Sequence, residues 1–383
     1  MRRIRSIQDM VAVRMQLRRE RQEAQTVVQR LSETLATIPD EKVPDAWRTV
    51  GFVQELSTAA AAMQEKKPST AVALAHLAIA VAAMIREDQY PPVVIAEAEA
   101  AAWRELANGH RYMSRYDAAL KALDAADRVL EPQPALGFDR AMTDFARAVV
   151  LSDLHRFDEA DAFLAASEGT FAEYHDRKRQ GDCLLLRGIN EHRRGNLAMA
   201  RSAYQAAIVT LRKAGDAASL AAAYNNLAHA ESDLGHYQPA AEALQKALAI
   251  FGELGATGEV ARAKWVLGRI LIGSERYLQA RDVLLEARRM LIALKMPEEA
   301  GLAGLELAEV FITLRDPFRA VAIVEEIVGE FRHAGLNERA STAVAYLRDL
   351  IETTRGRDAV RHVRAYVARL KQQPTLAFAP LPD

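Results

Sequence analysis

Apolar residues recur along the chain with the period of a helix, and the whole pattern recurs about every forty residues. The aligned position is alanine in seven successive segments, at Ala119, Ala160, Ala200, Ala240, Ala280, Ala320 and Ala359. Further apolar residues follow four and seven positions later, as in Ala200, Tyr204 and Ala207. This spacing is typical of one face of an α-helix. A repeat of this length predicts a solenoid built from stacked supersecondary units.

Each forty-residue unit is predicted to contain two helices. Turn residues such as Gly235-His236-Tyr237 precede the aligned alanine, and glycine or proline marks the loops between units, as at Pro297. A small residue stands twelve positions before the aligned one, at Ala107, Ala148, Gly188, Ala228, Gly268 and Ala308. Small residues let helices approach closely. A single hairpin cannot bury its apolar face alone, so we expect each unit to stack on the next.

The ends of the chain depart from this pattern, which indicates four segments. We expect a basic amphipathic helix and linker over 1–50, a capping or divergent helical pair over 51–95, a regular solenoid over 96–371, and an extended or disordered proline-containing tail over 372–383. Residues 1–30 hold eight arginines and three acids. This helix could cap the first repeat, form a dimer or partner contact, or bind nucleic acid. The last is disfavoured because no aromatic residue is interleaved with the arginines.

Composition and motifs restrict the function classes. The formal net charge is -1, which argues against a general binder of nucleic acid or of membrane surfaces. No apolar run approaches the roughly 18 residues that a membrane helix needs. The single cysteine, Cys183, allows no internal disulfide, so we expect a cytoplasmic protein. Metal-ligand spacing, a glycine-rich phosphate loop and a Gly-x-Ser-x-Gly motif are all missing from the sequence, so we expect no enzyme activity, no cofactor and no metal.

The repeat unit resembles the tetratricopeptide repeat (TPR). Trp103, Leu106 and Ala107 are similar to the first helix of that family's hairpin, and Ala200, Tyr204 and Ala207 to the second. The common repeat of the family has 34 residues, and the longer unit here is similar to those of kinesin light chains and bacterial peptide-sensing regulators. The resemblance implies an all-α, right-handed superhelical solenoid of seven to eight hairpins behind the N-terminal amphipathic helix.

In the register of that family, polar residues on the first helices line a concave groove. The predicted set is Arg104, Asn108, Arg111, His192, Arg193, Asn225, His229, Arg262, Trp265 and Arg269. Guanidinium groups bind carboxylates in a bidentate manner, and asparagine amides can hold an extended backbone. We therefore predict a groove for an acidic peptide or a free C-terminus. Alternatively, these side chains are solvated, pair with neighbouring acids or bind another ligand, and Trp265 also fits a core position.

Two functional hypotheses follow from these observations. The first is a non-enzymatic scaffold whose concave groove binds a peptide or protein segment. The second is a regulatory subunit of a bacterial signalling, transcription or protease system. In that case residues 1–35 would contact the partner or form a dimer, and the repeats would sense a signal.

Overall fold

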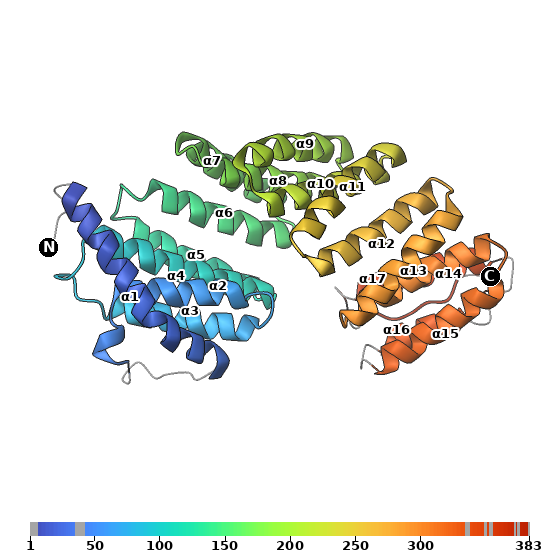
Figure 1. Ribbon diagram of the computed structural model, residues 1–383, viewed down its shortest axis with the longest axis horizontal. Coiled ribbons are helices and arrows are strands. Elements are labelled where there is room, and N and C mark those ends of the chain that lie inside the picture. Colours follow the sequence, from blue (N-terminus) through green and yellow to red (C-terminus); the bar gives the residue numbers. More distant parts are fainter. Residues whose placement is uncertain are drawn as a thin grey trace. The chain divides into compact units, whose positions relative to one another are not determined.

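The chain is an all-α TPR-like solenoid, as the sequence predicts (Figure 1). The computed structural model describes residues 7–34, 43–333, 338–347, 351, 355–370, 373 and 376–381. In these ranges there are 17 α-helices and one short 3-10 helix, η2. The chain divides into two compact units, Met1–Asn190 (unit 1) and Glu191–Asp383 (unit 2). No helix in the described ranges is long and apolar enough to cross a membrane.

Unit 1 begins with a long helix and continues as consecutive helical pairs. Its helices are α1 (Ile7–Thr34), η2 (Asp45–Trp47), α2 (Val50–Met63), α3 (Pro68–Ala83), α4 (Pro92–Tyr112), α5 (Tyr116–Leu130), α6 (Gly137–Asp153) and α7 (Phe157–Glu173). Helix α8 (Arg177–Arg194) crosses the division between the units. Helix α4 contacts both α2 and α6, so alternate helices pack side by side as well as in pairs.

Unit 2 continues the repeat to the C-terminal end. Its helices are α9 (Leu197–Ala214), α10 (Ala217–Asp233), α11 (Tyr237–Glu253), α12 (Thr257–Gly273), α13 (Tyr277–Ala293), α14 (Pro297–Thr313), α15 (Pro317–His333), α16 (Glu338–Tyr346) and α17 (Gly356–Leu370). Helix α12 contacts α10 and α14, and α14 contacts α17. These contacts bring side chains from four helices to one region of the unit.

A left-handed residue ends each regular helix and sets the length of the repeat. From His155 to Arg315, a residue with positive φ occurs every twenty positions. At Gly235, with φ 80°, the amide N–H donates to the Ser232 carbonyl at 3.0 Å. The next amide, of His236, donates to the Glu231 carbonyl at 2.8 Å. This pair of bonds is a Schellman motif, which satisfies carbonyls that the helix end leaves unpaired.

The predicted small residues allow close helix packing. Ala107, Ala148, Ala228 and Ala308 are fully buried. A Cβ atom added to Gly268 would lie 2.4 Å from a methyl carbon of Leu284, so α12 and α13 have no room for a side chain there. The predicted close approach of the two helices is confirmed at Gly268.

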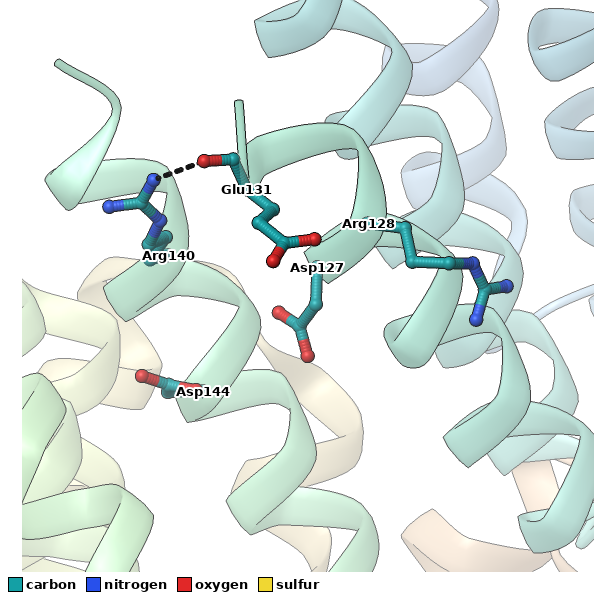
Figure 2. Close-up of a pocket in the computed structure, with 5 residues that line it drawn as sticks. All are labelled: Asp127, Arg128, Glu131, Arg140 and Asp144. Atoms are coloured by element: carbon teal, nitrogen blue, oxygen red, sulfur yellow. Dashed lines mark hydrogen bonds between the residues drawn. The ribbon is translucent and has the colours of Figure 1, made fainter. Parts of the chain in front are cut away.

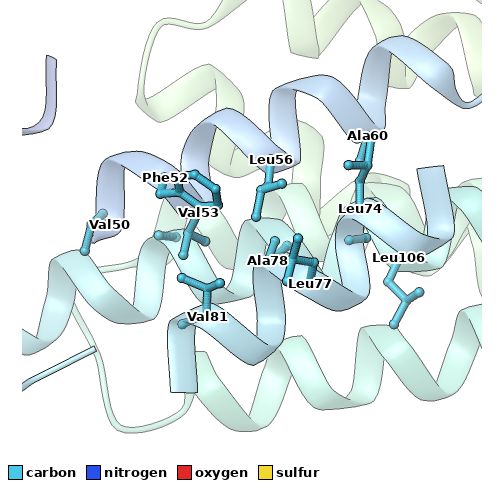
Figure 3. Close-up of a cluster of buried hydrophobic side chains, with 14 of the residues drawn as sticks. Val50, Phe52, Val53, Leu56, Ala60, Leu74, Leu77, Ala78, Val81 and Leu106 are labelled. Atoms are coloured by element: carbon cyan, nitrogen blue, oxygen red, sulfur yellow. The ribbon is translucent and has the colours of Figure 1, made fainter. Parts of the chain in front are cut away.

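Helix α1 covers the first helical pair of unit 1. The core of that pair consists of apolar side chains from α2, α3 and α4 (Figure 3). Ala24 and Val28 of α1 are buried against it. Helices α1 and α2 are so close that a Cβ atom added to Gly51 of α2 would lie 2.8 Å from the backbone nitrogen of Arg21 in α1. The described part of α1 therefore has the capping arrangement, while residues 1–6 and 35–42 lie outside the described ranges.

Candidate functional site

The candidate site is a pocket of about 250 Å³ in unit 2. It is lined by Ser232, Tyr237, Arg269, Ile272, Gly273, Glu309, Arg361 and Arg364. These residues come from α10, α11, α12, α14 and α17. The contacts of α12 with α10 and α14, and of α14 with α17, bring together residues more than a hundred positions apart in the sequence.

Two buried carboxylates of α14 contact the arginines of this site, and one of them, Glu309, lines the pocket. The side chains of Glu306 and Glu309 are each 3% exposed and stand three positions apart, on one helical face. The indole N–H of Trp265 donates to Glu306 at 2.7 Å, and Nε of Arg269 lies 3.5 Å from the same carboxylate. Nε of Arg361 donates to Glu309 at 2.6 Å. Both buried acids therefore have charged partners, as a buried carboxylate requires.

Three arginines surround the two carboxylates and remain accessible. Nη1 of Arg364 lies 3.5 Å from Glu306 and 3.4 Å from Glu309. The side chains of Arg269, Arg361 and Arg364 are 48%, 50% and 31% exposed. Among the described residues, the terminal nitrogens of Arg269 and Arg361 have no hydrogen-bond partner. The site thus holds three guanidinium groups against two carboxylates, with N–H donors free for an anionic ligand.

Burial makes the charge of this site depend on pH. Desolvation raises the pKa of Glu306 to about 7, and the nearby charges of Arg364 and Arg269 only partly oppose it. Burial therefore favours the protonated form of this carboxyl much more than in an exposed glutamate. When it is protonated, the three arginines face one carboxylate instead of two, and the site is more strongly positive.

Histidines and an aspartate extend the polar network along α10. A ring nitrogen of His192 lies 2.8 Å from the carboxylate of Asp233. This bond, together with nearby positive charge, holds the pKa of Asp233 below its usual value despite partial burial. Burial lowers the pKa of His229 to about 4, and the charge of Arg269 acts in the same direction. His229 is thus a neutral group beside the arginines at physiological pH.

Four residues of the predicted groove therefore belong to one network in unit 2, namely His192, His229, Trp265 and Arg269. The other three predicted residues of this unit do not line the pocket. Arg193 is exposed at the end of α8, and Asn225 is half-buried on α10. Arg262 is exposed on α12 and bonds to Glu259 of its own helix.

In unit 1 the predicted groove residues pair with neighbouring acids. Arg104 and Asp139 are joined at 3.1 Å, and both side chains are largely buried. Arg111 contacts Asp153, also at 3.1 Å. Asn108 hydrogen-bonds to Glu105 on the same helix. This agrees with the alternative interpretation for these three residues, and a continuous ladder through both units stays a prediction.

Sequence reasoning missed four charged residues of the site. Glu306 and Glu309 interrupt an otherwise apolar stretch of α14, from Gly301 to Phe311. Acids in such a stretch need partners, since unpaired charges are rarely buried. Arg361 and Arg364 repeat the same three-residue spacing in α17. This matched spacing is the signal that could have found them.

A second pocket, of about 380 Å³, lies in unit 1 between α5 and α6 (Figure 2). It is lined by Asp127, Arg128, Glu131, Arg140 and Asp144. Burial and the charge of Asp127 raise the pKa of Asp144 to about 6. Arg140 donates to the carbonyls of Leu130 at 2.9 Å and Gln133 at 3.1 Å, so it holds the loop between the helices. Among the described residues, no group of three or more acids, histidines or cysteines is arranged to hold a metal.

Comparisons with known proteins agree with the fold. Residues 183–253 match the family model described as Tetratricopeptide repeat. No curated protein matches the sequence significantly. A solved Rap protein complexed with competence and sporulation factor has 14% identity and a TM-score of 0.53, with 92% of this chain and 93% of that chain covered.

Two further solved structures have similar folds. The apo form of the quorum sensor NprR from B. thuringiensis has 14% identity and a TM-score of 0.58, with 94% of this chain and 99% of that one covered. Aspartyl phosphate phosphatase F from Bacillus subtilis has 13% identity and a TM-score of 0.56, with 84% of each chain covered. Identities this low concern the fold alone. Together with the match of residues 183–253 and the helical pairs described above, they show that the chain has a TPR-like fold.

Proposed function

We propose that this protein is a non-enzymatic TPR scaffold that binds a peptide or protein segment through a carboxylate. The observation that carries the proposal is the pocket of unit 2, where two buried glutamates hold three accessible arginines. The carboxylate would come from an acidic side chain or from a free C-terminus. It would bind to the open N–H donors of Arg269 and Arg361.

The geometry suits an anchoring site for one acidic group of a longer partner. The pocket of about 250 Å³ is smaller than the roughly 300–1,000 Å³ of sites for drug-sized ligands. Tyr237 and Ile272 supply apolar surface beside the arginines. The buried glutamates fix the guanidinium groups before the ligand arrives, and this preorganisation reduces the entropic cost of binding.

The similar structures support a regulatory binding role. One is a Rap protein complexed with competence and sporulation factor, and another is the quorum sensor NprR. A third is named a phosphatase, so the lack of catalysis in our protein is part of the proposal. We expect no acceleration of acetyl phosphate hydrolysis by the purified chain, and turnover that rises with protein concentration would contradict a purely non-enzymatic role.

The binding site is tested with a matched pair of arginine variants on α12. Fluorescein-labelled hexaglutamate should bind the wild-type chain saturably, whereas labelled hexalysine should not. Arg269→Gln should weaken hexaglutamate binding, because it removes a donor from the pocket. Arg262→Gln, two turns away and outside the pocket, should leave the affinity unchanged. Equal affinities for both variants, with intact helical circular dichroism, would overturn the assignment.

A second candidate function follows from the exposed face of α1. Val11 and Met15 are 50% and 66% exposed, and Arg14 and Arg18 are exposed on the same side. A regulatory subunit could contact its partner protein through this basic, apolar face. Arg14→Glu with Arg18→Glu should then abolish partner capture in a pull-down while hexaglutamate binding persists.

In either role we place the protein in the cytoplasm, as its single cysteine suggests.

A further inference from the structure

The C-terminal segment 376–381 lies against the last repeat without forming a helix or strand. Leu376, Phe378 and Leu381 are partly buried on the apolar core of α16 and α17. Ala377, Ala379 and Pro380 between them are exposed. The segment thus contacts the solenoid with three of its six side chains, as a bound extended peptide does.

Phe378 anchors this segment in an aromatic cluster. Its ring centre lies 5.3 Å from that of Tyr346 on α16. It also lies 5.7 Å from the ring of His362 and 5.0 Å from that of Tyr366, both on α17. The planes of the Tyr346 and Tyr366 rings are inclined to that of Phe378 by 65° and 63°, which is the edge-to-face arrangement that aromatic pairs prefer, and the His362 ring is tilted by 54°.

Two side chains of α17 also bind the backbone of the segment. The Tyr366 hydroxyl donates to the Leu376 carbonyl at 2.8 Å, and Nε2 of His362 donates to the Ala379 carbonyl at 2.7 Å. The donors are four positions apart, so they share one face of the helix. The acceptors are three positions apart, which is the repeat of an extended polyproline-type chain. Recognition of main-chain carbonyls does not require that the segment belong to the same chain.

Helix α17 keeps this surface apart from the arginine pocket. Val360, Val363 and Leu370 are buried in the core. Arg361 and Arg364 contact the glutamates of α14. His362 and Tyr366, which bind the tail, stand on a third face of the helix, because successive residues are separated by about 100° around its axis. A ligand can therefore occupy one surface without competing for the other.

We propose that the surface formed by Tyr346, His362 and Tyr366 (the tail site) binds extended protein segments of the pattern Leu-x-Phe-x-Pro-Leu. Residues 376–381 are its resident ligand, and a partner segment of the same pattern binds in exchange for them. Only five residues link the end of α17 to Leu376. Such a short tether gives the tail a high effective concentration, of the order of millimolar, so the intact tail competes strongly with free peptide.

The test uses the full chain with its own anchor weakened. The probe is a fluorescein-labelled peptide with the sequence of residues 372–383, and its binding is followed by anisotropy. The Phe378→Ala chain should bind the probe saturably, and at least about tenfold more tightly than the wild-type chain, whose tail competes. Phe378 lies outside every helix, so the helical circular dichroism should be unchanged.

Two matched controls locate the probe. A peptide with alanine at the position of Phe378 should not bind the Phe378→Ala chain. Adding Tyr366→Phe to that chain should weaken binding of the wild-type peptide, because a main-chain hydrogen bond is lost while the ring remains. The proposal would be overturned if a Phe378→Ala chain with intact circular dichroism failed to bind the probe saturably. It would also be overturned if the added Tyr366→Phe substitution left the affinity for the probe unchanged. The hexaglutamate assay is independent, so either proposal can fail alone.

Discussion

Glu306 links protonation to the stability of unit 2. Its folded pKa is about 7, because its side chain is buried, while an unfolded glutamate has a pKa of about 4.3. Folding therefore favours the protonated form. The stability that this group contributes is fully present below the unfolded pKa and is lost as the pH rises towards 7. One pKa unit corresponds to about 1.4 kcal/mol, so the loss across this window is ~3 kcal/mol.

The variant Glu306→Gln should remove this pH dependence. Glutamine stays neutral, so the free energy of unfolding of the variant, relative to that of wild type, should rise by ~3 kcal/mol from pH 5 to pH 8. Urea unfolding followed by circular dichroism measures both proteins. Comparing them at each pH cancels the contributions of other groups. Parallel stability curves for the two proteins would show that Glu306 titrates as an ordinary exposed acid.

The left-handed turn position gives a prediction that isolates backbone conformation. Gly235 has φ 80°, whereas Gly252 lies within helix α11, and an added Cβ would meet nothing within 4 Å at either position. Gly235→Ala should lower the free energy of unfolding by ~1 kcal/mol, because alanine is strained in this conformation. Gly252→Ala should raise it by up to ~1 kcal/mol through helix propensity. Equal effects in urea denaturation would contradict this account.

At the scale of elements, the carboxylate of Glu20 is one of the groups that hold α1 to the first helical pair. Glu20 accepts hydrogen bonds from the Tyr90 hydroxyl at 2.6 Å and from the Gly51 amide at 2.9 Å. Glu20→Ala should lower the free energy of unfolding by ~2 kcal/mol, since it leaves Tyr90, which is 1% exposed, without this acceptor. Glu23→Ala, at an exposed position of the same helix, should change it little. Equal thermal midpoints for the two variants would show that the hydrogen bonds of Glu20 do not stabilise the packing of α1.

The predicted helical pairs and the observed site show what a repeat pattern can and cannot predict. The forty-residue period predicts where the helices lie in the sequence, because each unit has the same apolar positions and the same left-handed turn, as at Gly235. The contact of α17 with α14 does not follow from that period. It joins Arg361 to Glu309, more than fifty residues apart, and α17 is the second helix of its unit. The family register, which places ligand contacts on first helices, therefore could not include Arg361 or Arg364.

At the scale of the whole molecule, the net charge is close to zero, but accessible positive charge is concentrated at one site. The chain carries a formal net charge of -1, yet the pocket of unit 2 gathers three arginines around two buried acids. In unit 1, comparable arginines are neutralised by pairs such as Arg104 with Asp139. The proposed binding site therefore depends on where arginines remain accessible rather than on their number. Of the arginines predicted to line the groove, Arg269 is the one found in the pocket.

Binding of an acidic ligand to this pocket should strengthen as the pH falls. Between pH 8 and pH 6, Glu306 takes up a proton, so Arg269 and Arg364 lose a competing negative charge. His229, with a pKa of about 4, stays neutral throughout this range. The side chains of hexaglutamate stay ionised, because their pKa values lie near 4.3. We expect hexaglutamate affinity to rise by about threefold or more from pH 8 to pH 6, equivalent to at least ~0.6 kcal/mol.

Two variants assign this pH dependence to a single group. Glu306→Gln mimics the protonated carboxyl, so it should bind hexaglutamate tightly at both pH values and show a flat profile. His192→Gln removes the other nearby titratable ring, which is bonded to Asp233, and should leave the wild-type profile intact. If the profile flattens in the His192 variant and persists in the Glu306 variant, the proton is taken up at the histidine. The buried carboxylate would then hold the arginines in place without responding to pH.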